Sequence, residues 1–124
     1  SMASGELTHV PGPHRSIMVG MNCGLPSAVA WPRLASGVDW VTAVDDDAAR
    51  QAMRDLAAAA VVAGETGAAS LAGLRALLDD PTAAAALGDR RELTALIVVT
   101  EGATDAAAYK QIVGRSAESV TTTR

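Results

Sequence analysis

Large hydrophobic side chains are scarce in this sequence. Its 124 residues include no Phe, one Tyr and two Trp, while 27 positions are alanine. The length suffices for one domain and not for two of normal size. A core of Ala, Val and Leu depends on close approach of the backbones and is marginal for an isolated domain this small. The shortage indicates either a fragment that packs against more protein or an alanine-rich proteome, and both explanations stay open at this point.

Basic clusters and cysteine pairs are missing as well. The formal net charge is −4, and the pair Arg90-Arg91 stands between the acids Asp89 and Glu92. Nucleic acid is therefore not an expected partner, because neutralising phosphates requires a clustered basic surface. The lone cysteine, Cys23, excludes an internal disulfide and a CxxC metal site, and it fits a reducing cytoplasm.

No apolar run approaches the length that spans a bilayer. The first residues also lack the charged and apolar regions of a signal peptide, so we expect a cytoplasmic location and no membrane partner. Ser1 before Met2 is typical of the residue that tag removal leaves behind. We therefore expect the natural chain to start at Met2, with nothing lost upstream.

Apolar segments typical of strands alternate along the chain with segments typical of helices. The candidate strands are residues 17–19, 38–44 and 93–99, and the last is apolar on both faces, as in a parallel sheet covered by helices. Short links between strands and helices predict an α/β fold. We expect a partial parallel-sheet layer of about three strands with flanking helices, which is thin enough to be the edge of a larger sheet. The expected division is a flexible tail over 1–15, a single α/β domain over 16–114 and a flexible tail over 115–124.

Start and stop signals bound the expected helices. A helix that begins near Pro26 should be short or kinked at Pro32 and should stop at Gly37. The last helix should begin at Thr104 or Asp105 and stop at Gly114. The other helices are expected over 46–60, 66–78 and 82–87. The helix over 46–60 should bury a stripe of Ala49, Met53, Leu56 and Ala60, and the helix over 66–78 has a small-residue face of Ala69, Ala72, Gly73 and Ala76.

The turn Gly64-Glu65-Thr66-Gly67 opens one of these helices. Free backbone N–H groups and the helix dipole favour an anion at such a position. The alternative is that Thr66 caps the helix and Glu65 is a solvated acid. Thr100 ends the apolar segment 93–99, and a hydroxyl at the carboxyl end of a parallel strand points into the crevice where α/β proteins bind ligands. The alternative here is a strand-end threonine that satisfies a backbone group.

Other reactive side chains lack the neighbours that chemistry needs. Cys23 has no placed His–Asp pair, so a structural role is the expected one. His9 and His14 lie in the Pro-rich tail, where a solvated histidine is the usual case and the spacing suggests no metal site.

An ordered series of segments along nearly the whole chain resembles a known family. The series consists of Pro11–His14, Met21–Ser27, Gly64–Ser70, Val98–Asp105 and Tyr109–Gly114. It resembles the C-terminal third of the fold-type II pyridoxal-phosphate enzymes, the diaminopropionate ammonia-lyases above all. The resemblance implies that this chain is the C-terminal part of the large domain of such an enzyme. The same resemblance implies that Gly64, Glu65 and Thr66 line the cofactor site. It also implies that Thr100 hydrogen-bonds the pyridine nitrogen, which suits β-elimination better than transamination.

One residue that this chemistry requires is missing. Catalysis with pyridoxal phosphate starts from a Schiff base with a lysine, and the only lysine here is Lys110, inside the last expected helix, where a solvated side chain is expected. A glycine-rich cup for the cofactor phosphate is missing too. We therefore expect no catalytic residue in this chain and no cofactor on the isolated chain.

Two functions follow from these observations. The first is a C-terminal fragment of a pyridoxal-phosphate-dependent ammonia-lyase that acts on a diamino acid such as 2,3-diaminopropionate and is inactive without the half that carries the lysine. The alternative is a free-standing α/β module that binds a partner or a small anion through the same crevice. The expected partners are a second copy of the chain, in a dimer, or an N-terminal half-enzyme.

Overall fold

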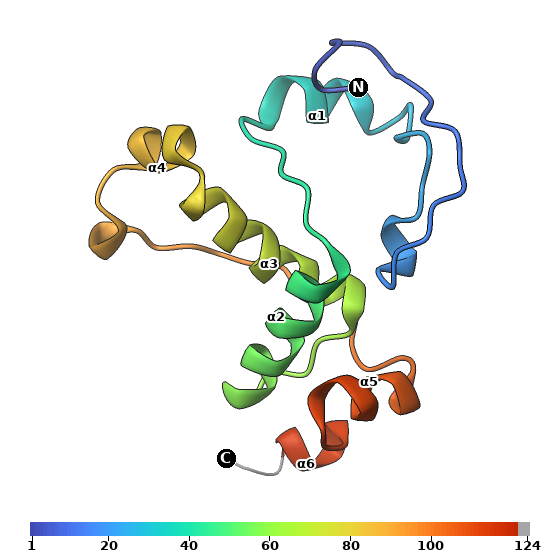
Figure 1. Ribbon diagram of the computed structural model, residues 1–124. Coiled ribbons are helices and arrows are strands. Elements are labelled where there is room, and N and C mark those ends of the chain that lie inside the picture. The colour runs from blue at the N-terminus through green and yellow to red at the C-terminus, as the bar shows by residue number, and fades with distance from the viewer. Residues whose placement is uncertain (122–124) are drawn as a thin grey trace.

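The computed structural model describes residues 1–121, and regular structure in that part of the chain is helical (Figure 1). Two of the helices are single 3₁₀ turns, and α2 and α3 are the two longest elements. In chain order the elements are η1 (Val19–Met21), α1 (Trp31–Gly37), α2 (Asp46–Ala58), α3 (Glu65–Asp79), α4 (Pro81–Leu87), η2 (Arg90–Glu92), α5 (Ala106–Val113) and α6 (Ala117–Thr121).

The predicted α/β fold with a parallel-sheet layer is wrong for this chain. Within residues 1–121 no strand is formed, although 38–44 and 93–99 run as long connections without helical turns (Figure 1). A helix closes its hydrogen bonds within one segment, whereas a strand exists only when a second strand lies beside it. The apolar segments pack against helices instead of pairing with each other. Of residues 17–19, the third predicted strand, Val19 is already the first residue of η1.

The sequence predicted the position of α2 correctly, except for its C-terminal end. The side chain of Asp45 accepts a hydrogen bond from the backbone N–H of Ala48 at 2.7 Å, and two further acids lie in the first turn. The helix ends at Ala58, because Ala60 adopts a positive φ of 62° and leaves the predicted stripe. The buried face consists of Ala49, Ala52, Met53, Leu56 and Ala57.

The remaining helices match the predicted positions with small differences. Gly88 and Gly114 follow α4 and α5 with positive φ angles of 82° and 84°. Asp105 caps α5 by accepting hydrogen bonds from the backbone N–H groups of residues 107 and 108. The prediction for α1 is right that the helix is short and ends at Gly37, but it is wrong about the start, which is Trp31 and not a residue near Pro26. Pro32 lies in the first turn, and Gly37 has no positive φ.

The core lies between α2, α3, α5 and α6 and is built mainly of alanine. α2 packs on α3, and the ion pair between Arg75 and Asp55 joins their exposed sides at 2.5 Å. Tyr109 of α5 and Val120 of α6 are fully buried against these helices. Residues 117–121, which the sequence analysis assigned to a tail, therefore contribute a helix to the core, while 122–124 lie outside the described residues.

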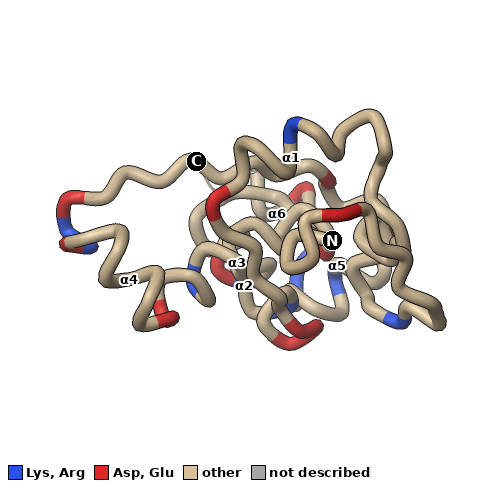
Figure 2. The backbone as a smooth tube through the Cα atoms, turned by 90° about the horizontal axis from the view of Figure 1, so that it is seen from above, with Lys and Arg blue, Asp and Glu red and all other residues tan. Residues whose placement is uncertain are grey.

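The N-terminal part forms an arc that extends away from this core (Figure 1). Its return to the core is fixed by Asp46, whose carboxylate accepts hydrogen bonds from the Ser16 hydroxyl at 2.7 Å and the Ile17 backbone N–H at 3.2 Å. Met18 is then buried beside Ala49 and Ala69. No helix within the described residues is long and apolar enough to cross a membrane. Acidic and basic residues are scattered over many elements (Figure 2).

Candidate functional site

The N-terminus of α3 is occupied by a carboxylate from this same chain. Glu101 accepts a hydrogen bond from the backbone N–H of Thr66 at 3.0 Å, and its second carboxylate oxygen accepts one from the hydroxyl of Thr104 at 3.0 Å. The backbone of the same residue takes part as well, because the N–H of Gly64 donates to the Glu101 carbonyl at 2.9 Å. The anion that the sequence analysis expected at this helix end is thus an internal side chain.

The two glycines of the turn allow this close approach. A Cβ atom on Gly64 would overlap the carbonyl oxygen of Gly102, and a Cβ atom on Gly67 would overlap the carbonyl oxygen of Glu101. Both glycines are buried. The turn therefore has glycine at these positions because segment 101–102 lies directly against the start of α3.

The surroundings of Glu101 favour its charged form. Burial raises its pKa, but the backbone N–H of Thr66 and the hydroxyl of Thr104, with further contacts to Thr66 and Gly67, lower the pKa by more in total. The net pKa lies below the ordinary value of a glutamate. Glu101 is consequently the charged cap of α3, a role that sequence reasoning missed. The signal was present in the Val98–Asp105 segment, whose polar turn supplies an acid just after an apolar run.

The predicted site residues lie close together, but they face different surroundings. Thr66 accepts a hydrogen bond from the backbone N–H of Gly20 through its hydroxyl at 3.2 Å, so its side chain joins η1 to α3. Thr66 does not cap α3 with its side chain, since the N-cap is Gly64 and the capping acceptor is Glu101. Thr100 is exposed, one residue before that acceptor, and no described residue hydrogen-bonds its hydroxyl. Gly64 and Thr66 are therefore engaged within the fold, and Thr100 is open to a partner group.

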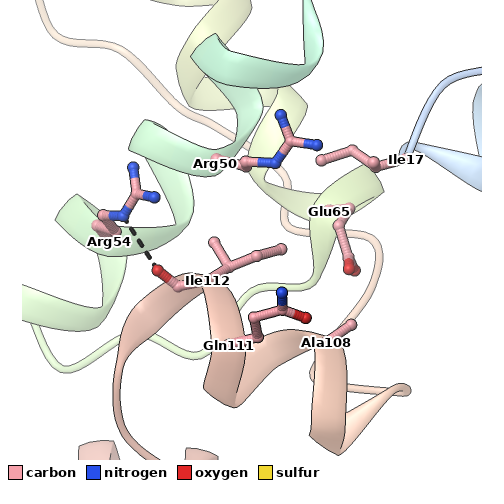
Figure 3. A pocket seen from close by; sticks show the side chains of 7 residues that line it. All are labelled: Ile17, Arg50, Arg54, Glu65, Ala108, Gln111 and Ile112. Carbon is pink, nitrogen blue, oxygen red and sulfur yellow. Dashed lines mark hydrogen bonds between the residues drawn. The ribbon is translucent and has the colours of Figure 1, made fainter.

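Glu65 faces a pocket of about 360 Å³ that lies between α2, α5 and the start of α3 (Figure 3). Arg50 and Arg54 reach it from successive turns of α2, and Gln111 points into it from α5. Each arginine is partly engaged: Arg50 pairs with Asp47 at 2.6 Å, and Arg54 donates to the carbonyl of residue 112 at 3.0 Å. The remaining guanidinium N–H groups are available to a small anion. The other lining residues are Ile17, Ala108 and Ile112.

The other reactive side chains lie apart from this region. Cys23 is exposed, and its Sγ donates to the carbonyl oxygen of Leu25 at 2.9 Å. Lys110 is exposed on α5, the element that also carries the pocket residue Gln111. Within residues 1–121 no group of three or more His, Cys, Asp or Glu side chains is placed to hold a metal ion.

Comparison with known proteins connects the chain to one family. The sequence profile of the family described as "Pyridoxal-phosphate dependent enzyme" matches residues 1–84. The diaminopropionate ammonia-lyase of Escherichia coli (strain K12) is 28% identical over 121 residues, which is 91% of this chain and 30% of that protein. The diaminopropionate ammonia-lyase of Salmonella typhimurium is 32% identical over 128 residues, which is 94% of this chain and 31% of that protein. The chain thus spans about three tenths of the length of the curated relatives it matches.

Proposed function

Since the chain belongs to the pyridoxal-phosphate dependent enzyme family, we propose that it is the C-terminal fragment of an ammonia-lyase of that family. In the assembled enzyme it takes part in β-elimination on a diamino acid such as 2,3-diaminopropionate, and it is inactive alone. The observation that carries this proposal is the asymmetry of coverage: more than nine tenths of this chain aligns with about three tenths of each diaminopropionate ammonia-lyase. We also propose a cytoplasmic location, in keeping with the single cysteine.

The residues of this chain do not by themselves fit pyridoxal phosphate. The N–H groups at the start of α3, which would suit a phosphate, are engaged by Glu101, and the only lysine lies exposed on α5. The proposed role of this chain therefore includes no catalytic step of its own. Its proposed contribution to the cofactor site is limited to the exposed hydroxyl of Thr100 and the turn of Gly64, Glu65 and Thr66. The Schiff-base lysine and the phosphate cup belong to the missing part.

The test is to treat the isolated chain with pyridoxal phosphate, reduce it with borohydride and map the adduct by mass spectrometry. We expect no stoichiometric adduct at Lys110 and no ammonia release from 2,3-diaminopropionate. Adding the seven tenths of the Salmonella relative that this chain does not match should give cofactor absorbance and ammonia release. A single-site adduct at Lys110 together with ammonia release from the isolated chain would contradict the proposal.

The pocket beside Glu65 supports a second candidate function, a small-anion-binding module. Arg50 and Arg54 lie one helical turn apart and both line this pocket (Figure 3). Under this alternative the isolated chain binds inorganic phosphate in calorimetry. Arg50→Gln should then weaken binding about tenfold, equivalent to about 1.4 kcal/mol, while Arg33→Gln on α1 should leave it unchanged. Equal phosphate affinity in the two variants would exclude this function.

A further inference from the structure

Two histidine side chains of the N-terminal arm, residues 1–15, face the same point beside Gly24. A Cβ atom on Gly24 would lie 2.8 Å from Nε2 of His14 and 3.4 Å from Nε2 of His9. The carbonyl oxygen of Val10 lies against the same position. Three atoms that can ligate a cation therefore converge on a backbone position that carries no side chain.

A turn in the arm and one backbone hydrogen bond account for this convergence. His9 and His14 lie on either side of Pro11-Gly12-Pro13, and proline and glycine are residues typical of turns. The backbone N–H of Val10 donates to the carbonyl of Gly24 at 2.7 Å and so holds the arm beside this glycine (Figure 1). In a fully extended tail, two histidines at this spacing would stay apart.

The loop that carries Gly24 is anchored to the rest of the fold. The side-chain amide of Asn22 donates to the Ser16 carbonyl at 2.8 Å, and its oxygen accepts from the Ser16 backbone N–H at 3.2 Å. The hydroxyl of Ser16 donates in turn to Asp46 at the start of α2. Hydrogen bonds thus hold both the arm and the loop, so the ligating atoms meet in a backbone arrangement that exists before any ion binds.

The three ligating atoms have no partner among the described residues. Neither imidazole makes a hydrogen bond or an ion pair there, and no described N–H donates to the carbonyl of Val10. Both histidines are exposed, so an ion reaches them directly from solvent. Neutral imidazole suits Zn²⁺, Ni²⁺ and Cu²⁺, whereas Mg²⁺ and Ca²⁺ prefer oxygen ligands. These atoms therefore favour a divalent transition metal.

Glycine at position 24 leaves room for such an ion between the ligands. Any larger residue would place its Cβ atom against the Val10 carbonyl and beside both imidazoles. The neighbouring thiol of Cys23 is directed elsewhere, since its Sγ donates to the Leu25 carbonyl at 2.9 Å. Within residues 1–121 no third side chain of His, Cys, Asp or Glu joins the two histidines in a metal-binding group. Water then completes the coordination of the ion, as it does at open zinc sites.

We propose that His9 and His14, together with the carbonyl of Val10, bind one divalent transition-metal ion, which fastens the N-terminal arm to the loop at Gly24. The proposal goes beyond the proposed function and is independent of it, because none of these residues is assigned to the cofactor site. An ion that joins two segments distant in the sequence closes a loop of the chain, and one that binds only the folded form stabilises it by mass action.

Calorimetric titration of the metal-free chain with zinc chloride, at a dilution where the chain sediments as a monomer, gives the first test. We expect saturable binding of one ion per chain. Loss of an outer-sphere partner typically weakens metal binding by roughly 10- to 100-fold, so His9→Gln and His14→Gln should each weaken it by at least about tenfold. Cys23→Ser is the matched control and should leave the zinc affinity unchanged, because its thiol is not one of the ligands.

Three results of this titration would overturn the proposal. They are the absence of saturable zinc binding, wild-type affinity in either histidine variant, and weakened binding in Cys23→Ser. A stoichiometry of one ion to two chains would overturn it as well, because the ion would then join two copies instead of the arm and the loop of one.

Nuclear magnetic resonance of the wild-type chain gives a second test that needs no variant. The sequence contains two histidines, so the imidazole signals report on this site alone. Both sets of signals should shift together and reach their final positions at one equivalent of zinc, and excess magnesium chloride should move neither. A zinc-dependent shift of only one imidazole, or equal shifts with magnesium, would contradict a site made by the two histidines.

Discussion

Glu101 shows how one side chain can fill a position that a sequence motif reserves for a ligand. The start of α3 offers free N–H groups, and an external anion is one way to satisfy them. Here an acid 35 positions later in the chain does so, at 3.0 Å from the Thr66 nitrogen. An internal carboxylate is held near the helix end at all times, so it competes effectively with a dilute external anion. The turn therefore has a structural role in this chain, because it connects the start of α3 to Glu101.

Replacing Glu101 by Gln should destabilise the fold by about 1 kcal/mol at pH 7, the usual size of a lost charged cap. The pKa of Glu101 is lower in the folded chain than its ordinary value of 4.5. The carboxylate therefore stabilises the fold fully above that value, and the contribution is lost as the pH falls through the lower, folded pKa. The stability difference between the wild type and Glu101→Gln should thus be constant from neutral pH to about pH 5 and shrink below pH 4.5.

Urea unfolding at several pH values measures this difference, with Glu92→Gln as the control at an exposed acid in η2. A difference for Glu101→Gln that stays the same down to pH 3 would show that the charge of the cap does not matter.

Thr100 and Cys23 should differ in their effect on the cofactor once the missing part is supplied. Thr100→Val removes the exposed hydroxyl proposed to meet the cofactor and should reduce cofactor absorbance in the complex at least several-fold. Cys23→Ser should leave absorbance and ammonia release unchanged, because this exposed thiol lies outside the site. Absorbance titrations of the two complexes decide the point. Normal cofactor binding by Thr100→Val would remove its proposed role, and loss of activity in Cys23→Ser would restore a role for the cysteine.

At the scale of elements, small residues determine how closely α3 approaches its neighbours. Gly67 faces the backbone at Glu101, and Gly73 faces the methyl group of Thr42 with ordinary contact distances. The same helix buries Ala69 and Ala72 against other segments. An alanine-rich sequence builds a small core in this way, by bringing backbones together instead of interlocking large side chains.

The two glycines of α3 should respond in opposite ways to alanine. Gly67→Ala places a methyl group against the Glu101 carbonyl oxygen and should destabilise the fold by about 1–3 kcal/mol. Gly73→Ala meets only an ordinary contact in mid-helix and should be neutral or stabilising by up to about 1 kcal/mol. Chemical denaturation of both variants gives the comparison. A Gly67→Ala variant as stable as Gly73→Ala would mean that segment 101–102 does not lie against α3.

At the scale of the whole molecule, the chain resembles one side of a larger core. α3 contacts both extended segments, at Thr42 and at Val99, while large apolar side chains such as Val41 and Leu96 remain exposed. Exposed apolar surface of this extent promotes association. The net charge of −4 opposes association only weakly, because salt screens exposed charges beyond about 8 Å at physiological ionic strength.

The isolated chain should therefore self-associate at micromolar concentration, and adding the missing part should reverse this association. Edge-to-edge contact is the expected mode, because Ala69 and Ala72 of the small-residue face are buried within the monomer. Sedimentation velocity over a dilution series is the measurement. A monomer that stays unchanged across the series would mean that the core closes on itself and that the chain is a complete small domain.

The sequence by itself determined the features that depend on neighbouring residues. The caps at Asp45 and Asp105 and the stops at Gly88 and Gly114 follow from local hydrogen bonds and backbone freedom, and the order of the turns was enough to indicate the family. The tertiary structure alone decided the features that need a distant partner. Glu101 fills the helix end because segment 101–102 reaches α3, and residues 1–121 form no sheet because a strand requires a neighbour. Apolar alternation in a sequence shows that a segment can be a strand, and only the surrounding protein supplies the second strand.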